Sequence, residues 1–236
     1  MPGMSNLPPG FTPPEPIPSG QPLPHRKIIR GWLAPLVERR TLLAVAMLVL
    51  DWLIFAALMS GTVLLKAIWA KLLCGLAAGF VIGRLFIIGH DACHQSYTPH
   101  RRLNRVLGRI AMLPSLTPYS LWEVGHNVVH HGYTNLKGVD FVWAPLTQEE
   151  FAALPARKRL MERIYRSGWA PGLYYMVEIW WHKMLFPSKR AMPTRRSVFI
   201  WDGVLVTVFG ALWAAALTGV AHLPHQPVLP LLAVAG

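Results

Sequence analysis

The chain has 236 residues, of which 53% are hydrophobic and only 14% charged, and its mean hydropathy is +0.35. This composition is far more apolar than that of an average soluble domain, so water cannot be the only solvent of the protein. The formal net charge of +12 would suit nucleic acid on a soluble fold, but the basic residues here alternate with long apolar stretches. We therefore expect an anionic membrane surface, and no nucleic acid, to be the partner of this charge.

The cysteines and the N-terminal residues exclude two further classes of protein. Cys74 and Cys93 are too few for a disulfide framework or for a thiolate-rich metal site built from this chain alone. The N-terminus lacks the basic start and apolar run of a cleavable signal peptide, and it is rich in proline as far as Pro24. We expect residues 1–40 to form a Pro-rich cytoplasmic arm, and we assign no chemistry to its proline-rich part.

Three apolar stretches are long enough to cross a bilayer as helices, which takes about 20 residues. They cover residues 41–65, 67–89 and 197–221. A fourth apolar run, 227–236, is too short to cross. The sequence predicts an all-α protein, in which residues 41–236 form an integral membrane helical bundle and residues 90–196 form its cytoplasmic helical cap.

The basic residues predict the orientation of these spans. The first two spans are joined by a short connection and should form an antiparallel hairpin with both outer ends on one side of the membrane. Lys and Arg gather before this hairpin and between Arg101 and Arg196, so the positive-inside rule places the N-terminus and the cap in the cytoplasm. We expect a multi-pass protein of the cell inner membrane. Aromatic and basic residues also predict an interfacial amphipathic helix over 171–186, with an ordinary packed helix as the alternative.

Five of the ten histidines fall in two short clusters, HDACH and HNVVHH. Residues four apart share one face of a helix, so His90 with His94, and His126 with His130, should each aim two imidazoles at a common point. His131 is displaced by about a third of a turn from His130 and could serve a second metal. A group of neutral imidazoles suits iron, copper, zinc or nickel.

The remaining histidines predict no metal site of this kind. His25, His100 and His182 are isolated, as surface or packing residues usually are. His222 and His225 follow the third span and should lie across the membrane from the two clusters. Beside the clusters, Asp91 and Asn127 could orient imidazoles by hydrogen bonds, although a local capping role is equally open.

The two boxes, within the run WEVGHNVVHHGYTN from Trp122 to Asn135 and followed by Asp140 and Trp143, resemble the membrane fatty-acid desaturase and hydroxylase superfamily. That family carries one box of the form HxxxH or HxxxxH and two of the form HxxHH or HxxxHH, on a cytoplasmic cap above four membrane helices. The resemblance implies a di-iron (Fe) centre to which this chain contributes the following metal ligands: His90, His94, His126, His130 and His131. The third box, which follows the fourth membrane helix in the family, is missing after Arg196, so we expect a C-terminally truncated fragment, or else a natural, inactive truncation.

The resemblance also implies an activity and its partners. The enzyme would be an O₂-dependent oxidoreductase that introduces a C=C bond into an acyl chain held in an apolar tunnel between cap and membrane helices. No GxGxxG unit or fused haem domain is evident, so a separate ferredoxin or cytochrome would donate the electrons.

Three alternatives remain open from the sequence. A carotenoid or alkane hydroxylase or ketolase would use the same boxes on another lipid. A zinc-dependent membrane hydrolase or a metal transporter would bind zinc or carry ionisable residues in mid-membrane, where this chain offers only Asp51 and Asp202. The chain could also be a non-catalytic membrane protein.

Overall fold

The computed structural model describes residues 10–134, 136–140, 142, 145–168, 170–185 and 197–221, without the side chains of 171 and 217–221. Several features singled out from the sequence lie outside these residues: the apolar run 227–236, His222, His225, Phe186, Asn135 and Trp143. The chain divides into two units, Met1–Arg40 and Thr41–Gly236. The first contains α1 (Arg26–Leu33) and the short 3₁₀ helix η2 (Ala34–Leu36).

Every regular element in the described residues of the second unit is a helix, and three helices are long and apolar enough to cross a membrane. These are α2 (Thr41–Leu64), α3 (Ile68–Cys93) and α9 (Ser197–Ala221), of which Ser197–Ala216 is the candidate span. The predicted fold class, an all-α membrane bundle, is confirmed. Helix α3 continues beyond its apolar stretch to Cys93, so it carries His90 within its last turn.

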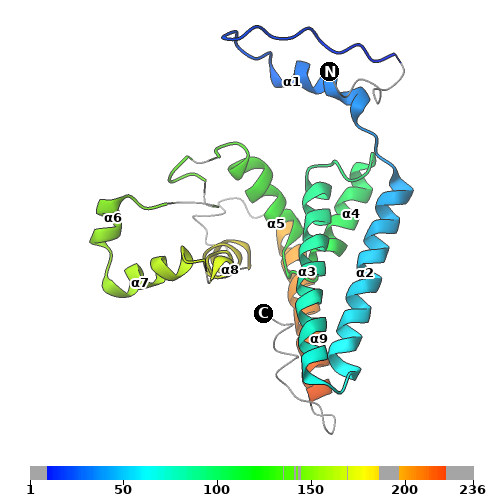
Figure 1. Cartoon of the computed structure of the whole chain (residues 1–236), viewed down its shortest axis with the longest axis vertical. Coiled ribbons are helices and arrows are strands. Elements are labelled where there is room, and N and C mark those ends of the chain that lie inside the picture. The colour runs from blue at the N-terminus through cyan, green and yellow to red at the C-terminus, as the bar shows by residue number, and fades with distance from the viewer. Residues whose placement is uncertain are drawn as a thin grey trace. The chain divides into compact units, whose positions relative to one another are not determined.

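Helices α2 and α3 form an antiparallel hairpin (Figure 1). Leu48, Phe55 and Leu85 are buried along their seam. Gly61 allows the close approach near the turn, because a Cβ atom there would lie 2.7 Å from the Sγ of Cys74. Lys71 Nζ donates to the carbonyl oxygen of Val63 at 3.1 Å. The two helices are therefore held together beside their turn.

Asp51 and Asp202, the acidic residues within the apolar stretches, are held in ion pairs. Asp51, only 1% exposed, accepts from Arg84 Nη2 at 2.9 Å and from Arg84 Nε at 3.1 Å, which joins α2 to α3. Asp202 of α9 accepts from Arg109 Nε at 2.6 Å. Pairing offsets the cost of a charge within the bilayer. The two carboxylates therefore act as links between helices.

Helix α4 (Arg101–Met112) returns along α3, and α5 (Tyr119–Val124) continues directly into the π-helix η3 (Gly125–His130). Two glycines set these contacts: a Cβ atom at Gly89 would lie 2.5 Å from Met112 Cγ, and one at Gly108 would lie 2.2 Å from the ring of Tyr119. Asp202 also accepts from the backbone N–H of Ser120 at 2.8 Å, so a carboxylate from α9 caps the N-terminus of α5.

The rest of the cap contains α6 (Gln148–Ala153), α7 (Ala156–Tyr165), α8 (Pro171–Tyr174) and the π-helix η4 (Tyr175–Leu185). A capping box between Thr147 and Glu150 begins α6. Ile179 and Met184 of η4 are buried in the same hydrophobic cluster as Trp122, and Trp180 Nε1 donates to the carbonyl oxygen of Leu116 at 2.8 Å. A helical segment thus spans 171–185 and packs on the core; its place at the headgroup boundary stays a prediction.

Candidate metal centre

The first histidine cluster lies at the C-terminal end of α3. His90 belongs to the last turn, and His94 is the C-cap residue, whose backbone N–H donates to the carbonyl oxygen of His90 at 3.1 Å. The two rings lie side by side, with centroids 4.5 Å apart. The i, i+4 spacing therefore places both imidazoles at one point on the helix end, as the sequence predicts.

The second cluster lies on a π-turn. The backbone N–H of His131 donates to the carbonyl oxygen of His126 at 2.9 Å, five residues back. The chain can close this turn because residue 132 is glycine: a Cβ atom there would lie 2.3 Å from the carbonyl oxygen of Val128. The sequence predicts an α-helix here, so the π-turn is a difference of one residue in register.

This register changes which imidazoles pair within the second cluster. The Nε2 atoms of His126 and His131 lie 3.0 Å apart, and their ring centroids 4.5 Å apart. His126 and His130, the pair expected from α-helical spacing, are stacked at 5.6 Å instead. The pair whose nitrogens converge is thus i, i+5, in addition to the i, i+4 pair that the α-helical spacing indicates.

The two clusters meet. The ligand atoms of His90, His94 and His126 all lie within 4.8 Å of one another. His131 joins them, with its ring centroid 4.9 Å from that of His94. His130 lies at the edge, with its centroid 5.5 Å from that of His131. The structure therefore brings four of the five predicted residues together and places the fifth beside them.

These residues fit a metal of the kind that imidazole binds. Two nitrogens that share one ion at about 2.1 Å in tetrahedral geometry lie about 3.4 Å apart, near the 3.0 Å between His126 and His131. The ligand atoms of His90, His94 and His126 lie within 4.8 Å of one another, and this limit slightly exceeds the distance between two ligands of one ion. Binding of one ion by all three therefore needs small rotations of the rings. The donors are imidazole nitrogens, as the cysteine count requires.

Carboxylates fix the far side of two imidazoles. Asp140, 1% exposed, accepts from His130 Nδ1 at 3.0 Å through Oδ2, and its Oδ1 accepts from the backbone N–H of Val142 at 3.0 Å. Asp91 Oδ1 accepts from His90 Nδ1 at 2.9 Å. An ionised carboxylate only accepts, so Nδ1 carries the proton in both rings and the lone pair of Nε2 is left for a metal.

Two further contacts hold η3 against α3. The ring of Trp122 stacks on that of His126 at 4.1 Å and 20°, and its edge meets His90 at 5.5 Å. Asn127 Nδ2 donates to the carbonyl oxygen of Cys93 at 2.9 Å. Asn127 therefore ties the two cluster-bearing helices together through a hydrogen bond from its side-chain amide to the backbone.

The surroundings keep the central imidazoles neutral. Burial, with the neighbouring His90, His131, His94 and His130, lowers the pKa of His126 to about 3. Burial and the rings of His90 and His131 also lower the pKa of His94, against a smaller opposite effect of Asp91. Near neutral pH both rings are unprotonated, which is the form that binds a metal ion.

Three supporting residues were not assigned a role from the sequence. Trp122 lies within the run that carries the resemblance and Asp140 follows it, whereas Asp202 is a lone charge in an apolar stretch. That lone charge was a usable signal, because a carboxylate within a span implies a partner inside the protein. The isolated His25, His100 and His182 are exposed, as expected, and His25 caps α1 by accepting from the backbone N–H of Lys27.

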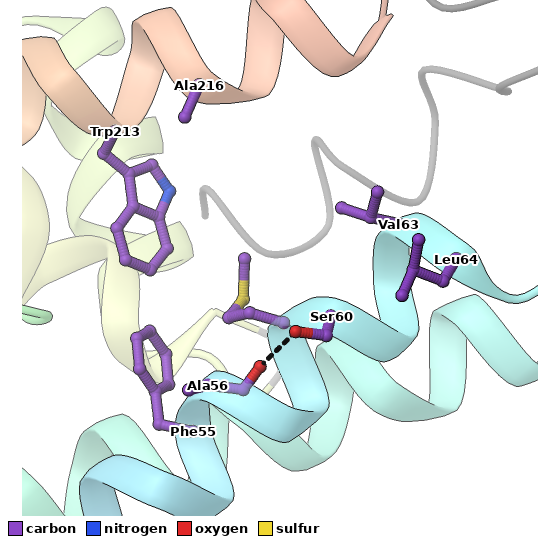
Figure 2. Close-up of a pocket in the computed structure, with 8 residues that line it drawn as sticks. Phe55, Ala56, Ser60, Val63, Leu64, Trp213 and Ala216 are labelled. Atoms are coloured by element: carbon purple, nitrogen blue, oxygen red, sulfur yellow. Dashed lines mark hydrogen bonds between the residues drawn. The ribbon is translucent and has the colours of Figure 1, made fainter.

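An apolar cavity of about 400 Å³ lies between α2 and α9, away from the histidines (Figure 2). Phe55 and Trp213 stack on one side of it, and Val63 lies at its other end. Val63 contacts Lys71, which is separated from His90 by roughly 28 Å of helix. This cavity is therefore not the acyl tunnel expected beside the clusters, and that tunnel stays a prediction.

The fold and the cluster define a class: a helical membrane protein whose imidazoles could hold a metal at the end of a membrane span. Residues 66–236 match the model of the fatty acid desaturase family. The chain belongs to this family, and the resemblance inferred from the histidine boxes is confirmed.

Curated relatives are similar to parts of the chain. A fatty acid desaturase of Bacillus subtilis (strain 168) is 39% identical over 94 residues, which cover 39% of this chain and 26% of that protein. An sn-1 oleoyl-lipid 12-desaturase of Picosynechococcus sp. is 29% identical over 136 residues, 57% of this chain and 38% of the relative. An sn-1 oleoyl-lipid 12-desaturase of Arthrospira platensis is 26% identical over 182 residues, which cover 76% of this chain and 48% of the relative. The chain spans about a quarter to a half of the length of these relatives.

Proposed function

We propose that the protein is an acyl-lipid desaturase, an O₂-dependent oxidoreductase, and that His90, His94, His126, His130 and His131 contribute ligands to its di-iron centre. The observation that carries this proposal is the convergence of imidazoles from two separate helices, with the ligand atoms of His90, His94 and His126 within 4.8 Å of one another. The three relatives described above are named as desaturases, which favours this reaction over hydroxylation, ketolation or zinc-dependent hydrolysis.

Bound iron supplies the activation of O₂ that removal of hydrogen from an unactivated methylene requires, since no side chain provides it. The other residues of this chain hold the imidazoles and set their orientation. Asp140 keeps the proton of His130 on Nδ1, and Asp91 does the same for His90. The stacked ring of Trp122, which is buried, keeps water from one face of His126. The neutral state of His94 and His126 leaves their lone pairs available.

The partners follow from the surroundings of this centre. The substrate is a lipid acyl chain, because the cluster lies at the end of a membrane span. The positive-inside rule places this end on the cytoplasmic side of the inner membrane. A separate ferredoxin or cytochrome donates the electrons, and the exposed basic residues at the start of α4, Arg101, Arg102 and Arg105, offer it a docking surface next to the first cluster.

The proposal is tested by metal and product analysis. The protein, together with any residues that its gene encodes after Gly236, is purified from a bacterial host, and its iron and zinc contents are measured by mass spectrometry. The fatty acids of the host are analysed by gas chromatography with and without O₂ and a co-expressed ferredoxin. We expect two irons per chain and new, O₂-dependent double bonds, both lost in His94→Ala and kept in the exposed-histidine control His182→Ala. A centre filled by zinc, or unsaturated product that persists in His94→Ala, would contradict the proposal.

A further inference from the structure

Helix α1 has two chemically opposite faces. Residues four apart form columns along a helix, and Arg26 with Arg30 forms one such column, next to Lys27. Ile28 with Trp32, and Ile29 with Leu33, form the columns of the opposite side. The basic and apolar side chains therefore do not mix, although the helix has only eight residues.

The described residues of the first unit do not cover the apolar face. None of the α1 residues is buried, and Ile28 and Leu33 are each 50% exposed. The exposed apolar surface continues into Leu36 and Val37. A helix of this length is marginal in water, since most helical stability comes from packing of the apolar face. Something outside the described part of the first unit must therefore cover this face if α1 is to persist.

Charge and position identify what covers it. Residues 26–40 carry the basic residues Arg26, Lys27, Arg30, Arg39 and Arg40 against the single acidic residue Glu38. The membrane span α2 begins at Thr41, only four residues after η2 ends at Leu36, and four extended residues reach about 14 Å. A bilayer surface is therefore always within reach of α1, and anionic lipid headgroups attract its basic face.

We propose that α1 is an interfacial helix that folds on an anionic lipid surface. Its axis lies in the plane of the membrane, with Ile28, Ile29, Trp32 and Leu33 among the upper acyl carbons and the three basic side chains among the headgroup phosphates. Trp32 belongs to the residue type enriched at this depth. The proposal rests on the first unit alone and does not depend on the metal centre or on desaturase activity.

Hydrogen exchange of the full chain in lipid nanodiscs tests this proposal. Exchange of the amides of residues 26–33 is compared between discs of phosphatidylcholine alone and discs that contain phosphatidylglycerol. We expect exchange to be at least tenfold slower in the anionic discs, and this protection to fall as salt is raised, because salt screens the attraction. Equal exchange rates in the two lipid compositions would overturn the proposal.

Variants distinguish binding of α1 to the lipid from a general attraction between the basic protein and anionic lipid. Neutralising its three basic residues (Arg26→Gln, Lys27→Gln, Arg30→Gln) and removing two apolar side chains (Ile29→Ser, Leu33→Ser) should each abolish the protection. A matched triple variant on α7, Arg157→Gln with Lys158→Gln and Arg159→Gln, makes the same charge change elsewhere and should leave it intact. An equal loss of protection in the α7 variant would also overturn the proposal. Protection that depends on protein concentration and not on lipid charge would overturn it too, and would indicate a second protein chain as the partner of α1.

Discussion

The two histidine clusters reach the same point by different routes. The first lies on a 26-residue helix packed against α2 and α4, and its two imidazoles converge through ordinary α-helical spacing. The second lies on a six-residue π-turn that follows a six-residue helix. The position of the first is set by its helix alone. The position of the second depends on contacts with side chains and backbone outside the turn, some of them near in the chain and some distant.

Those contacts come from several directions. Trp122 stacks on His126, Asn127 bonds to the carbonyl oxygen of Cys93, and Asp140 accepts from His130. Asp202 caps the N-terminus of α5, the helix that leads into the π-turn. Removing one of these contacts should therefore weaken metal binding through the second cluster. The first cluster should tolerate the loss of its carboxylate neighbour, Asp91.

The largest effect is expected within the second cluster itself. His126 is central, with ring contacts to His90, His94, His130 and His131. His126→Ala should lower iron affinity by more than about a hundredfold, beyond the usual cost of losing an outer partner of a ligand. His130→Ala removes the imidazole at the edge of the cluster and should lower iron affinity by less. Metal titration of the purified variants measures both, and equal losses would show that the edge position of His130 is misjudged.

Asp140→Asn should have the next largest effect. An amide can donate to Nδ1 of His130, which places the proton on Nε2 and removes the lone pair that faces the cluster. We expect iron affinity to fall by about 10- to 100-fold, the range seen when an outer partner of a metal-bound histidine is lost. The same titration measures this loss. An unchanged affinity would mean that the His130–Asp140 contact is structural only.

Asp202→Asn tests the distant support. The change leaves the mostly buried Arg109 without its carboxylate partner and weakens the cap on α5. We therefore expect the free energy of unfolding to fall by about 1 to 3 kcal/mol. This is less than the full cost of breaking a buried ion pair, because Arg109 retains some exposure. Iron affinity should fall several-fold. Thermal unfolding in detergent and metal titration measure the two effects.

The control for this variant is the other ion pair of the membrane helices. Asp51→Asn breaks the contact with Arg84 in the α2–α3 hairpin and should also destabilise the protein, but it should leave iron affinity unchanged. If both variants lowered iron affinity equally, the link from Asp202 to the second cluster would be disproved.

The smallest effect is expected from Asp91→Asn in the first cluster. His90 is held by α3, and the contact with Asp91 is partly exposed, so solvent weakens it. Partly exposed pairs of this kind contribute about 1 kcal/mol or less, and iron affinity should change by less than about fivefold. A loss as large as that of Asp140→Asn, measured in the same titration, would erase the distinction between the two clusters.

The sequence predicted what depends on length and local spacing. The apolar stretches of α2, α3 and α9 had to be membrane helices, and the HxxxH spacing of His90 and His94 had to converge on a helix end. It did not predict the π-turn, because an α-turn and a π-turn of HNVVHH differ by one residue in hydrogen-bond register. The stacking of Trp122 on His126 and the space at Gly132 accompany the π-turn, and the spacing of the histidines alone does not reveal either. The pairing of Asp202 with Arg109, 93 residues apart, is likewise beyond local spacing.

The π-turn offers a reason why both HxxHH and HxxxHH can serve as boxes of this superfamily. With two residues between the first histidine and the final pair, the first and last histidines are four apart and align on an ordinary α-turn. With three, as between His126 and His131, they are five apart and align only on a turn that is one residue wider. An insertion or deletion in this box would therefore leave the imidazole pair aligned only if the backbone changed its winding by one residue at the same place.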